Sequence, residues 1–201
     1  NSSDYYLNCY RSNQSIAVFY IYKMITISEN IQLTSVLSSD SEFLFKLMKE
    51  IYPAAYSHFW TDKGDWYVNT QYSEENILKE ISEENSDNHF VLFKDEIIGN
   101  FRIIWDEKLK GLTQKKQVKL HRIYLQQKTQ GNGIGKKVLS WLEDKAKQKG
   151  YEIIWLDAMN EQPQAFQFYK KLGYKYHSHI ILPFDLLYDE ARKMSQVYKE
   201  I

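Results

Sequence analysis

The sequence contains very little cysteine, because Cys9 is the single one among 201 residues. One cysteine can form neither a disulfide within the chain nor a cysteine-based zinc cluster. A chain without disulfides fits a reducing compartment, so we expect a cytoplasmic protein. Cys9 also lies far from every motif described below, which leaves a covalent acyl-enzyme without support.

An excess of charge of either sign is missing as well, because 26 Lys and Arg residues balance 26 Asp and Glu residues. A neutral chain has no overall attraction to a polyanion, so we expect no nucleic-acid partner. The sequence has no long apolar run near its N-terminus. The stretch "IAVFYIY" at residues 16–22 is far shorter than the roughly 20 residues of a membrane-spanning helix. We therefore expect no membrane partner.

The length of the chain fits one domain of about 150 to 200 residues. Only Arg11 precedes the short apolar run, where a signal peptide needs a basic region. Met24 then opens a stretch that reads like an ordinary start. We predict that residues 1–23 are a leader or an N-terminal extension outside the fold, and that residues 24–201 form a single domain.

Apolar periodicity and turn residues predict an α/β chain. The predicted strands lie at 31–36, 89–105 (a hairpin joined at Asp95 and Glu96), 117–125, 152–158 and 174–182, and the predicted helices at 40–52, 73–85, 135–149 and 163–173. We expect Ser39 and Glu42 to form a capping box, and Pro53 and Gly64 to interrupt the chain after the first helix. Residues 191–201 fit a helix or a strand. This order predicts a mixed sheet with helices packed on its faces.

Three glycines stand within five residues in "GNGIG" (131–135), between a predicted strand and a predicted helix. The first N–H groups of a helix have no intrahelical partner, and glycine allows close approach, so this turn suits a phosphate. A P-loop needs G-x-x-x-x-G-K-S/T, whereas Gly131 and Gly135 are too close together and Lys137 replaces the Ser or Thr. The dinucleotide pattern G-x-G-x-x-G differs too. Nucleoside triphosphates and NAD are therefore disfavoured.

Two motifs in series identify a family. The glycine loop matches the pattern Q/R-x-x-G-x-G/A at Gln130, Gly133 and Gly135. The pattern A-x-x-F-Y-x-K-x-G-F/Y follows, at Ala165, Phe168, Tyr169, Lys171, Gly173 and Tyr174. With these motifs the sequence resembles the GNAT acetyltransferases from Ile31 to Lys199. The resemblance implies the GNAT fold, a central, mixed, mostly antiparallel and splayed sheet of six to seven strands with about four helices.

The resemblance implies acetyl-coenzyme A as the cofactor. In this family the strand before the loop splays from the next strand, and the pantetheine arm pairs with backbone in the gap. The glycine loop then holds the pyrophosphate through its N–H groups. The implied cofactor-binding residues are Ile123, Leu125, Gln130, Gly131, Asn132, Gly133, Ile134, Gly135, Lys136, Asn160, Gln162 and Lys171. Lys137 fits a phosphate contact and a solvated helix start equally well.

The family usually carries Asn at the position of Gln162. Asn160 lies two residues earlier and is an alternative contact to the cofactor. Gln162 fits equally well as the residue that precedes Pro163 at the start of the predicted helix.

Two residues are the catalytic candidates. Tyr169 matches the family's general acid, which implies that its phenol protonates or hydrogen-bonds the departing thiolate, although periodicity alone fits a core aromatic residue. His121 stands where several members carry a glutamate base, and its ordinary pKa of about 6.5 suits that task. A single histidine on a strand is usually structural, so Asp157, Glu161 and a chain of water molecules remain alternative bases.

The resemblance implies a primary amine of a small molecule as acceptor, bound by Tyr56, Trp60 and Trp66. Aromatic walls with carboxylates nearby suit a cation, which favours a polyamine-like acceptor. The nearby carboxylates are Asp62, Asp65, Glu74 and Glu75. The same aromatic and acidic residues fit equally well a hydrophobic hinge with solvated carboxylates.

The segments "RIYL", "IWL" and "AFQFYKKLGY" are also similar to bacterial spermidine/spermine N-acetyltransferases. A protein N-terminal or lysine acetyltransferase, and a non-catalytic acyl-CoA-binding sensor, remain alternative functions.

Further expectations concern metals and assembly. His177 and His179 are two residues apart on a predicted strand, so their side chains point to the same face. Two ligands without a third seldom form a zinc site, so we expect no metal. The resemblance implies direct transfer from thioester to amine. A homodimer is the expected assembly, because small members of the family are often homodimers.

Overall fold

The computed structural model describes residues 5–8, 20–113 and 116–201. Its strands are β1 (Tyr5–Asn8), β2 (Tyr20–Ser28), β3 (Ile31–Ser35), β4 (Ser86–Phe93), β5 (Glu96–Trp105), β6 (Gln117–Leu125), β7 (Ile153–Met159), β8 (Lys175–Ile181) and β9 (Lys193–Glu200). Its α-helices are α1 (Ser41–Tyr56), α2 (Asp65–Gln71), α3 (Glu74–Ser82), α4 (Ile134–Gln148) and α5 (Pro163–Lys171). None of these helices is long and apolar enough to cross a bilayer.

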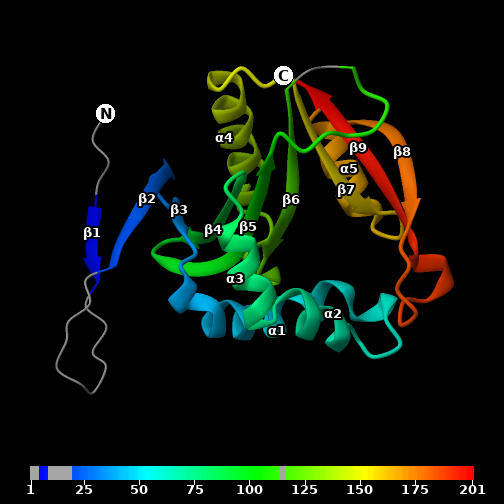
Figure 1. Cartoon of the computed structure of the whole chain (residues 1–201), viewed down its shortest axis with the longest axis horizontal. Coiled ribbons are helices and arrows are strands. Elements are labelled where there is room, and N and C mark those ends of the chain that lie inside the picture. The colour runs from blue at the N-terminus through cyan, green and yellow to red at the C-terminus, as the bar shows by residue number, and fades with distance from the viewer. Residues whose placement is uncertain (1–4, 9–19, 114–115) are drawn as a thin grey trace.

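The strands form one sheet in the order β1-β2-β3-β4-β5-β6-β7-β9-β8, with β1 at one edge and β8 at the other (Figure 1). Neighbouring strands are antiparallel except β6 and β7, which are parallel. This confirms the predicted mixed, mostly antiparallel sheet. The nine strands and five α-helices of the described chain exceed the predicted six to seven and about four. The additional elements are β1, β2 and the short α2.

The helices cover both faces of the sheet, and the two larger core clusters follow the alternation of the side chains along the strands. On β4, Val91 belongs to the cluster that also contains the apolar residues of α4, whereas its neighbours Phe90 and Leu92 belong to the cluster with α1, α2 and α3. Side chains of α5 pack against the first cluster. The strands in the middle of the sheet, such as β4, β5 and β7, are therefore buried on both sides.

Several element boundaries confirm the local predictions. Helix α3 starts after Ser73, whose hydroxyl accepts a hydrogen bond from the Asn76 N–H at 3.2 Å. The predicted hairpin between β4 and β5 is present, but its turn lies one residue earlier than predicted, at Lys94 and Asp95, because Glu96 already pairs with Phe93. The φ values of 52° and 65° are those of a two-residue turn of the primed type. Gly150, with φ of 74°, follows the end of α4. Residues 191–201, for which the sequence fitted a helix or a strand, contain the strand β9.

The first helix differs from its prediction. Pro53 lies inside α1, which continues to Tyr56 instead of ending near residue 52. Burial of Ile51 and Tyr52 against the core outweighs the helix-breaking tendency of the proline. The capping box of Ser39 and Glu42 is also wrong, because α1 has Asp40 as its N-cap residue, without a side-chain cap, and its carboxylate accepts from the Leu37 N–H instead (2.8 Å).

The N-terminal end of the chain joins the sheet through β2. This strand runs from Tyr20 to Ser28, so the predicted domain boundary between residues 23 and 24 falls inside it. The division of the chain at that point stays a prediction. Cys9 lies outside the described residues.

Candidate active site

A gap opens in the sheet between β6 and β7. The two strands pair only from Gln117 with Ile153 to Leu120 with Leu156. Beyond that point β7 pairs with β9 alone, and β6 with β5 alone. The pairing with β5 skips His121, which makes this residue the extra one of a β-bulge. A bulge bends its strand and increases its twist, which accounts for the divergence of β6 from β7.

The gap presents unpaired backbone. The Gln126 N–H donates to the Ile98 carbonyl of β5 at 2.8 Å. Because the N–H and C=O groups of successive residues in a strand point to opposite sides, those of Ile123 and Leu125 point away from β5 and toward the gap. This is the orientation that the predicted pairing of these two residues with pantetheine needs.

The glycine loop lies at the end of the gap and opens α4. Gly131 and Gly133 have φ of 83° and 70°, a region that non-glycine residues rarely occupy. A Cβ on either one would meet no atom within 4 Å, so the space beside the loop is open. At Gly135 a Cβ would lie 3.4 Å from the ring of Phe168. The two sequence motifs are therefore in contact in space.

The loop leaves a row of N–H groups without backbone partners. Helix α4 begins its hydrogen bonding with the Lys137 N–H, which donates to the Gly133 carbonyl at 3.1 Å. In the described chain, none of the N–H groups of residues 131–136 donates to a backbone carbonyl. The Gln130 N–H differs, because it donates to the Gln127 carbonyl at 3.0 Å. This hydrogen bond argues against the predicted role of the Gln130 N–H as a donor to phosphate, and that role stays a prediction.

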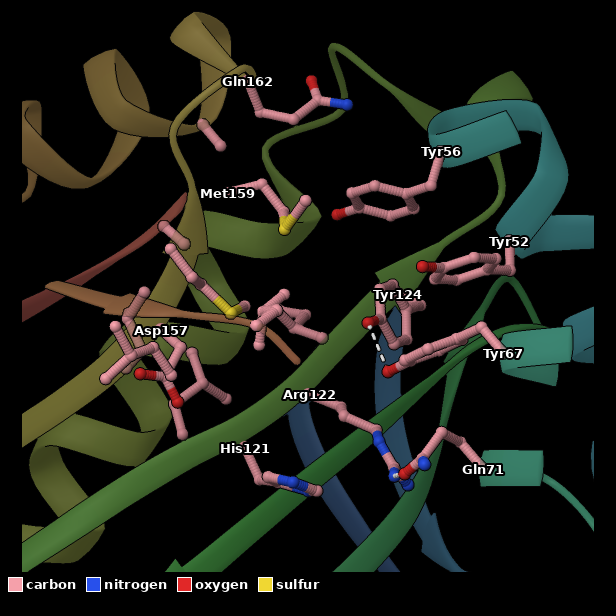
Figure 2. A pocket seen from close by; sticks show the side chains of 18 of the residues that line it. Tyr52, Tyr56, Tyr67, Gln71, His121, Arg122, Tyr124, Asp157, Met159 and Gln162 are labelled. Atoms are coloured by element: carbon pink, nitrogen blue, oxygen red, sulfur yellow. Dashed lines mark hydrogen bonds between the residues drawn. The ribbon is translucent and has the colours of Figure 1, made fainter. Parts of the chain in front are cut away.

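One pocket of about 240 Å³ continues from the gap toward α1 and α2. Its walls come from segments far apart in the sequence, several of them labelled in Figure 2. They are residues 120–124 of β6 and 156–159 of β7, Tyr52 and Tyr56 of α1, Trp60 between α1 and α2, Tyr67 and Gln71 of α2, Gln162, Ala165 and Tyr169 at α5, and Ile180, Leu182, Phe184 and Met194 near the C-terminus.

Tyr169 lines this pocket from α5, as its predicted catalytic role requires. Its ring packs edge-on against Phe168 and Tyr174, with centroids 5.3 and 5.6 Å away. Burial, with a smaller contribution from Tyr56, raises the pKa of Tyr169 well above the ordinary value. The phenol is therefore neutral at neutral pH and able to donate a hydrogen bond.

His121 lies in the same pocket, but its surroundings argue against the predicted role as base. The Nδ1 atom lies 2.6 Å from Nη1 of Arg102. Burial, followed by the charges of Arg122, Arg102 and Lys119, lowers the pKa of His121 to about 2. The ring therefore stays neutral near pH 7 and has little affinity for a further proton.

Two buried arginines lie at the pocket, where Arg122 is one of the lining residues, and sequence reasoning missed both. Arg102 of β5 and Arg122 of β6 are cross-strand partners, and each side chain is 3% exposed. Glu80 of α3 binds both, at 3.5 Å from Arg102 and 2.7 Å from Arg122, and Glu83 pairs with Arg102. Buried charges of this kind require partners. The signal in the sequence was an arginine next to apolar residues in each of two strands, in "FRI" and in "RIYL".

Aromatic rings form the far wall of the pocket. Tyr52 stacks on Tyr56 and on Tyr67, with centroids 4.9 and 4.3 Å apart. The hydroxyl groups of Tyr67 and Tyr124 are 3.2 Å apart, the dashed line in Figure 2. Burial, followed by the charge of Tyr67, raises the pKa of Tyr56 to about 12. The wall is therefore neutral at neutral pH.

The predicted aromatic residues divide into a lining pair and a supporting residue. Tyr56 and Trp60 line the pocket. Trp66 does not, and packs instead behind Trp60 and Phe184, with centroids 5.9 and 5.0 Å away. Sequence reasoning named Phe184 in no role, although the apolar segment "LPF" at 182–184 was a signal for it.

The carboxylates that favoured a polyamine do not line the pocket. Asp62 accepts from the N–H groups of Gly64 and Trp66, and Asp65 pairs with Lys49. Glu74 and Glu75 lie in the first turn of α3, outside the lining.

Asp157 is the one carboxylate among the lining residues of the described chain. It is bound to Lys119 at 2.7 Å and to Gln196 at 3.1 Å. The pocket therefore offers no unpaired acid to a cation.

Of the remaining predicted residues, two form hydrogen bonds within the protein and two are exposed at the surface. The Gln162 side chain lines the pocket and donates to the Ala55 carbonyl at 3.0 Å, which ties α5 to the end of α1. Asn160 accepts from the Ser195 hydroxyl at 2.7 Å and lies outside the lining. Lys171 and Glu161 are exposed and also lie outside it. The pocket thus brings Gln162 together with Tyr169, without Asn160 or Lys171.

Further polar candidates lie at the surface. Lys136 and Lys137 are exposed beside the loop. His177 binds the Lys110 carbonyl and His179 the Tyr176 hydroxyl. The described residues contain no group of three or more His, Cys, Asp or Glu side chains that would hold a metal.

Comparison with known proteins identifies a family. The model of the acetyltransferase (GNAT) family matches residues 45–174. An uncharacterised N-acetyltransferase encoded in the pepI 3' region of Lactobacillus delbrueckii subsp. lactis is 24% identical over 101 residues. That match covers 50% of this chain and 58% of the relative, so little more than half of the relative's length is matched.

Solved structures share the fold. A PaiA N-acetyltransferase from Thermoplasma acidophilum, in complex with coenzyme A, has a TM-score of 0.63 at 19% identity, with 85% of this chain and 99% of that chain covered. RimL, a ribosomal L7/L12 alpha-N-protein acetyltransferase in complex with coenzyme A, has a TM-score of 0.67 at 13% identity, covering 89% and 98%. Spermidine N-acetyltransferase SpeG from Vibrio cholerae has a TM-score of 0.57 at 17% identity, covering 86% and 95%.

Proposed function

The chain belongs to the acetyltransferase (GNAT) family, and from that premise we propose that it is an N-acetyltransferase. It transfers the acetyl group of acetyl-coenzyme A directly to a primary amine of a small molecule. One observation carries the proposal. A single pocket joins the backbone gap between β6 and β7, where Tyr169 lies, to the aromatic wall of α1 and α2. The acetyl donor and the amine acceptor therefore have adjoining binding sites.

The cofactor is held mainly by backbone. The peptide groups of Ile123 and Leu125 bind the pantetheine arm, and the N–H groups of residues 131–136 bind the pyrophosphate, with Lys136 adding positive charge. Two complexes of structural relatives contain coenzyme A, which supports this choice. When bound, acetyl-coenzyme A supplies an activated thioester.

Tyr169 acts as the acid of the reaction. Its neutral phenol lines the pocket and donates a hydrogen bond to the sulfur as the amine displaces it. The amine must lose a proton before it attacks. Asp157 is the lining carboxylate and accepts this proton, directly or through water. An Asp157→Asn variant with unchanged kcat would remove Asp157 from the mechanism.

The acceptor is a small amine, because the pocket has a volume of only about 240 Å³ and a largely aromatic wall. A polyamine-like acceptor was favoured by the sequence. That preference now rests on the aromatic wall alone, because the four carboxylates that supported it lie outside the lining. Spermidine and the N-terminus of a protein are acceptors named for structural relatives, so both belong in the test.

A thiol-release assay with acetyl-coenzyme A tests the proposal. The panel contains spermidine, diamines, amino acids, aromatic amines, aminoglycosides and peptides with a free N-terminus. We expect turnover with at least one small amine, and intact-mass analysis should find no acetylated protein. Tight binding of acetyl-coenzyme A by calorimetry without turnover would contradict the proposal in favour of an acyl-CoA sensor. Turnover with peptides alone would replace the small amine with a protein acceptor.

A further inference from the structure

The hydrogen bond between Arg102 and His121 determines where the imidazole carries its proton. A guanidinium has N–H donors and no acceptor. The His121 Nδ1 atom, 2.6 Å from Arg102 Nη1, must therefore accept. In the neutral ring the proton is then on Nε2, so His121 presents a donor and not a base on that side.

Arg102 itself is held in place, which fixes this tautomer. Its guanidinium pairs with Glu83 and lies 3.5 Å from Glu80, and its Nε donates to the Ser86 hydroxyl at 3.1 Å. The side chain is only 3% exposed. A buried arginine with these partners cannot leave without uncovering unpaired charges, so His121 cannot exchange its tautomer at low cost.

The His121 Nε2–H group is free for a ligand. His121 lines the pocket, and Figure 2 shows it next to Arg122 on β6. In the described chain its ring is hydrogen-bonded to Arg102 through Nδ1, and no hydrogen bond involves Nε2. A donor at the wall of a cavity requires an acceptor atom, from water or from a bound molecule. Nitrogen in a protonated amine cannot accept, whereas carboxylate and carbonyl oxygens can.

The charges around the ring favour the same kind of group. Arg102, Arg122 and Lys119 all act on His121. The nearby carboxylates of Glu80, Glu83 and Asp157 are each in an ion pair with one of these cations. A second ammonium group in this part of the pocket would meet cations and occupied carboxylates. An oxygen atom with negative charge would meet a donor and favourable charges.

We propose that His121 binds an oxygen atom of the acceptor, so that the site selects amines carrying a carboxylate or carbonyl oxygen over amines that carry only further amino groups. This inference rests on the proposed function and names its substrate class. His121 is then a substrate-binding residue that determines specificity. Arg102 is a positioning residue, because it acts through the ring of His121.

Matched pairs of amines that differ by one carboxylate test the inference. They are lysine with cadaverine, tyrosine with tyramine, and phenylalanine with phenethylamine, each assayed for kcat/KM, with spermidine added. We expect the carboxylate member to be favoured about tenfold or more in at least one pair. The amides of the three amino acids separate the two sources of oxygen. Activity near that of the acid assigns the carbonyl, and activity near that of the decarboxylated amine assigns the carboxylate.

Variants connect the preference to His121. His121→Leu has no donor, and we expect the ratio within the pair to fall to about 1, mainly through a higher KM for the carboxylate member. His121→Asn retains an N–H donor and should keep part of the preference. The affinity for coenzyme A should change in neither variant, which also shows that both are folded.

The tautomer can be measured without turnover. In a ¹⁵N-histidine NMR spectrum we expect the His121 ring to be protonated at Nε2 and not to titrate between pH 5 and pH 8. Protonation at Nδ1, or titration near pH 6.5, would overturn the inference.

The activity data separate this inference from the proposed function. Turnover of spermidine or of the decarboxylated amines without a carboxylate preference would overturn the inference and leave the proposed function intact. The absence of turnover with every amine would contradict both.

Discussion

The two ends of the pocket are built from different parts of the chain. At the end proposed for the cofactor, which we call the cofactor end, the groups are backbone: the N–H and C=O groups of Ile123 and Leu125 in the gap and the N–H groups of residues 131–136. At the end proposed for the amine, the acceptor end, the groups are side chains: stacked tyrosines, and a histidine beside two buried arginines. Tyr169 lies where the two ends meet.

This difference explains why the cofactor end can be predicted from the sequence and the acceptor end cannot. A backbone site needs glycine at positions of positive φ and a helix start, and these leave a short pattern in the sequence. A side-chain site is assembled from residues far apart in the chain. Arg102 is 19 positions from His121, and no local pattern joins them. A family motif therefore predicts the cofactor, whereas the acceptor depends on contacts that only the fold creates.

Removal of the Tyr169 hydroxyl should have the largest effect, because this group serves both ends. We expect Tyr169→Phe to reduce kcat by roughly 10²- to 10⁴-fold, the range for loss of a general acid, with little change in the affinity for coenzyme A.

Tyr174→Phe is the matched control. It removes a buried hydroxyl that has no hydrogen-bond partner in the described structure and lies outside the pocket lining. Equal kcat values for the two variants would contradict the role of Tyr169.

A change in the loop should affect the cofactor end alone. Gly133 has φ of 70°, where a β-branched residue is strained, so Gly133→Val should distort the row of N–H groups. We expect coenzyme A binding by calorimetry to weaken by about 1 to 3 kcal/mol.

The KM for the amine, measured at saturating acetyl-coenzyme A, should stay within a factor of about two, because the side chains at the acceptor end are not moved. Gly150→Val, which strains a similar φ of 74° at the other end of α4, is the control. Weaker coenzyme A binding by that variant too would show that the loss arises from general strain.

A pH experiment should give the smallest effect and addresses the acceptor end. The folded-state pKa of His121 is lowered to about 2, whereas the unfolded value is about 6.5. As pH falls below 6.5, the unfolded chain binds a proton that the folded chain does not, so the stability present above pH 6.5 is progressively lost.

Between pH 7 and pH 5.5 this loss amounts to about 1 kcal/mol. Urea denaturation at the two pH values should therefore find a smaller loss for His121→Asn than for the wild-type chain, by about that amount. An equal pH dependence of both proteins would mean that His121 titrates normally and that its contact with Arg102 is weak.

The extent of successful prediction follows the same division. From residue 31 onward the order of strands and helices was predicted, except for the short α2 and for residues 191–201, which fitted a helix or a strand. The glycine loop before α4 was predicted as well, because it depends on turn residues and a motif. Tyr169 lines the pocket, and its catalytic role stays a prediction. The continuation of α1 through Pro53 was not predicted, since burial of its apolar face outweighs local propensity. His121 was predicted as a base from its ordinary pKa, and the partner that changes its chemistry lies on a neighbouring strand.

Amide hydrogen exchange with and without coenzyme A tests the central claim most directly, namely that the cofactor is bound by backbone in the gap and at the loop. The account predicts that the amides of Ile123, Leu125 and residues 131–136 become protected on binding. The Gln130 amide is an internal control, because it already donates to the Gln127 carbonyl at 3.0 Å and should change little. Binding of coenzyme A without new protection in the gap and the loop would contradict the account.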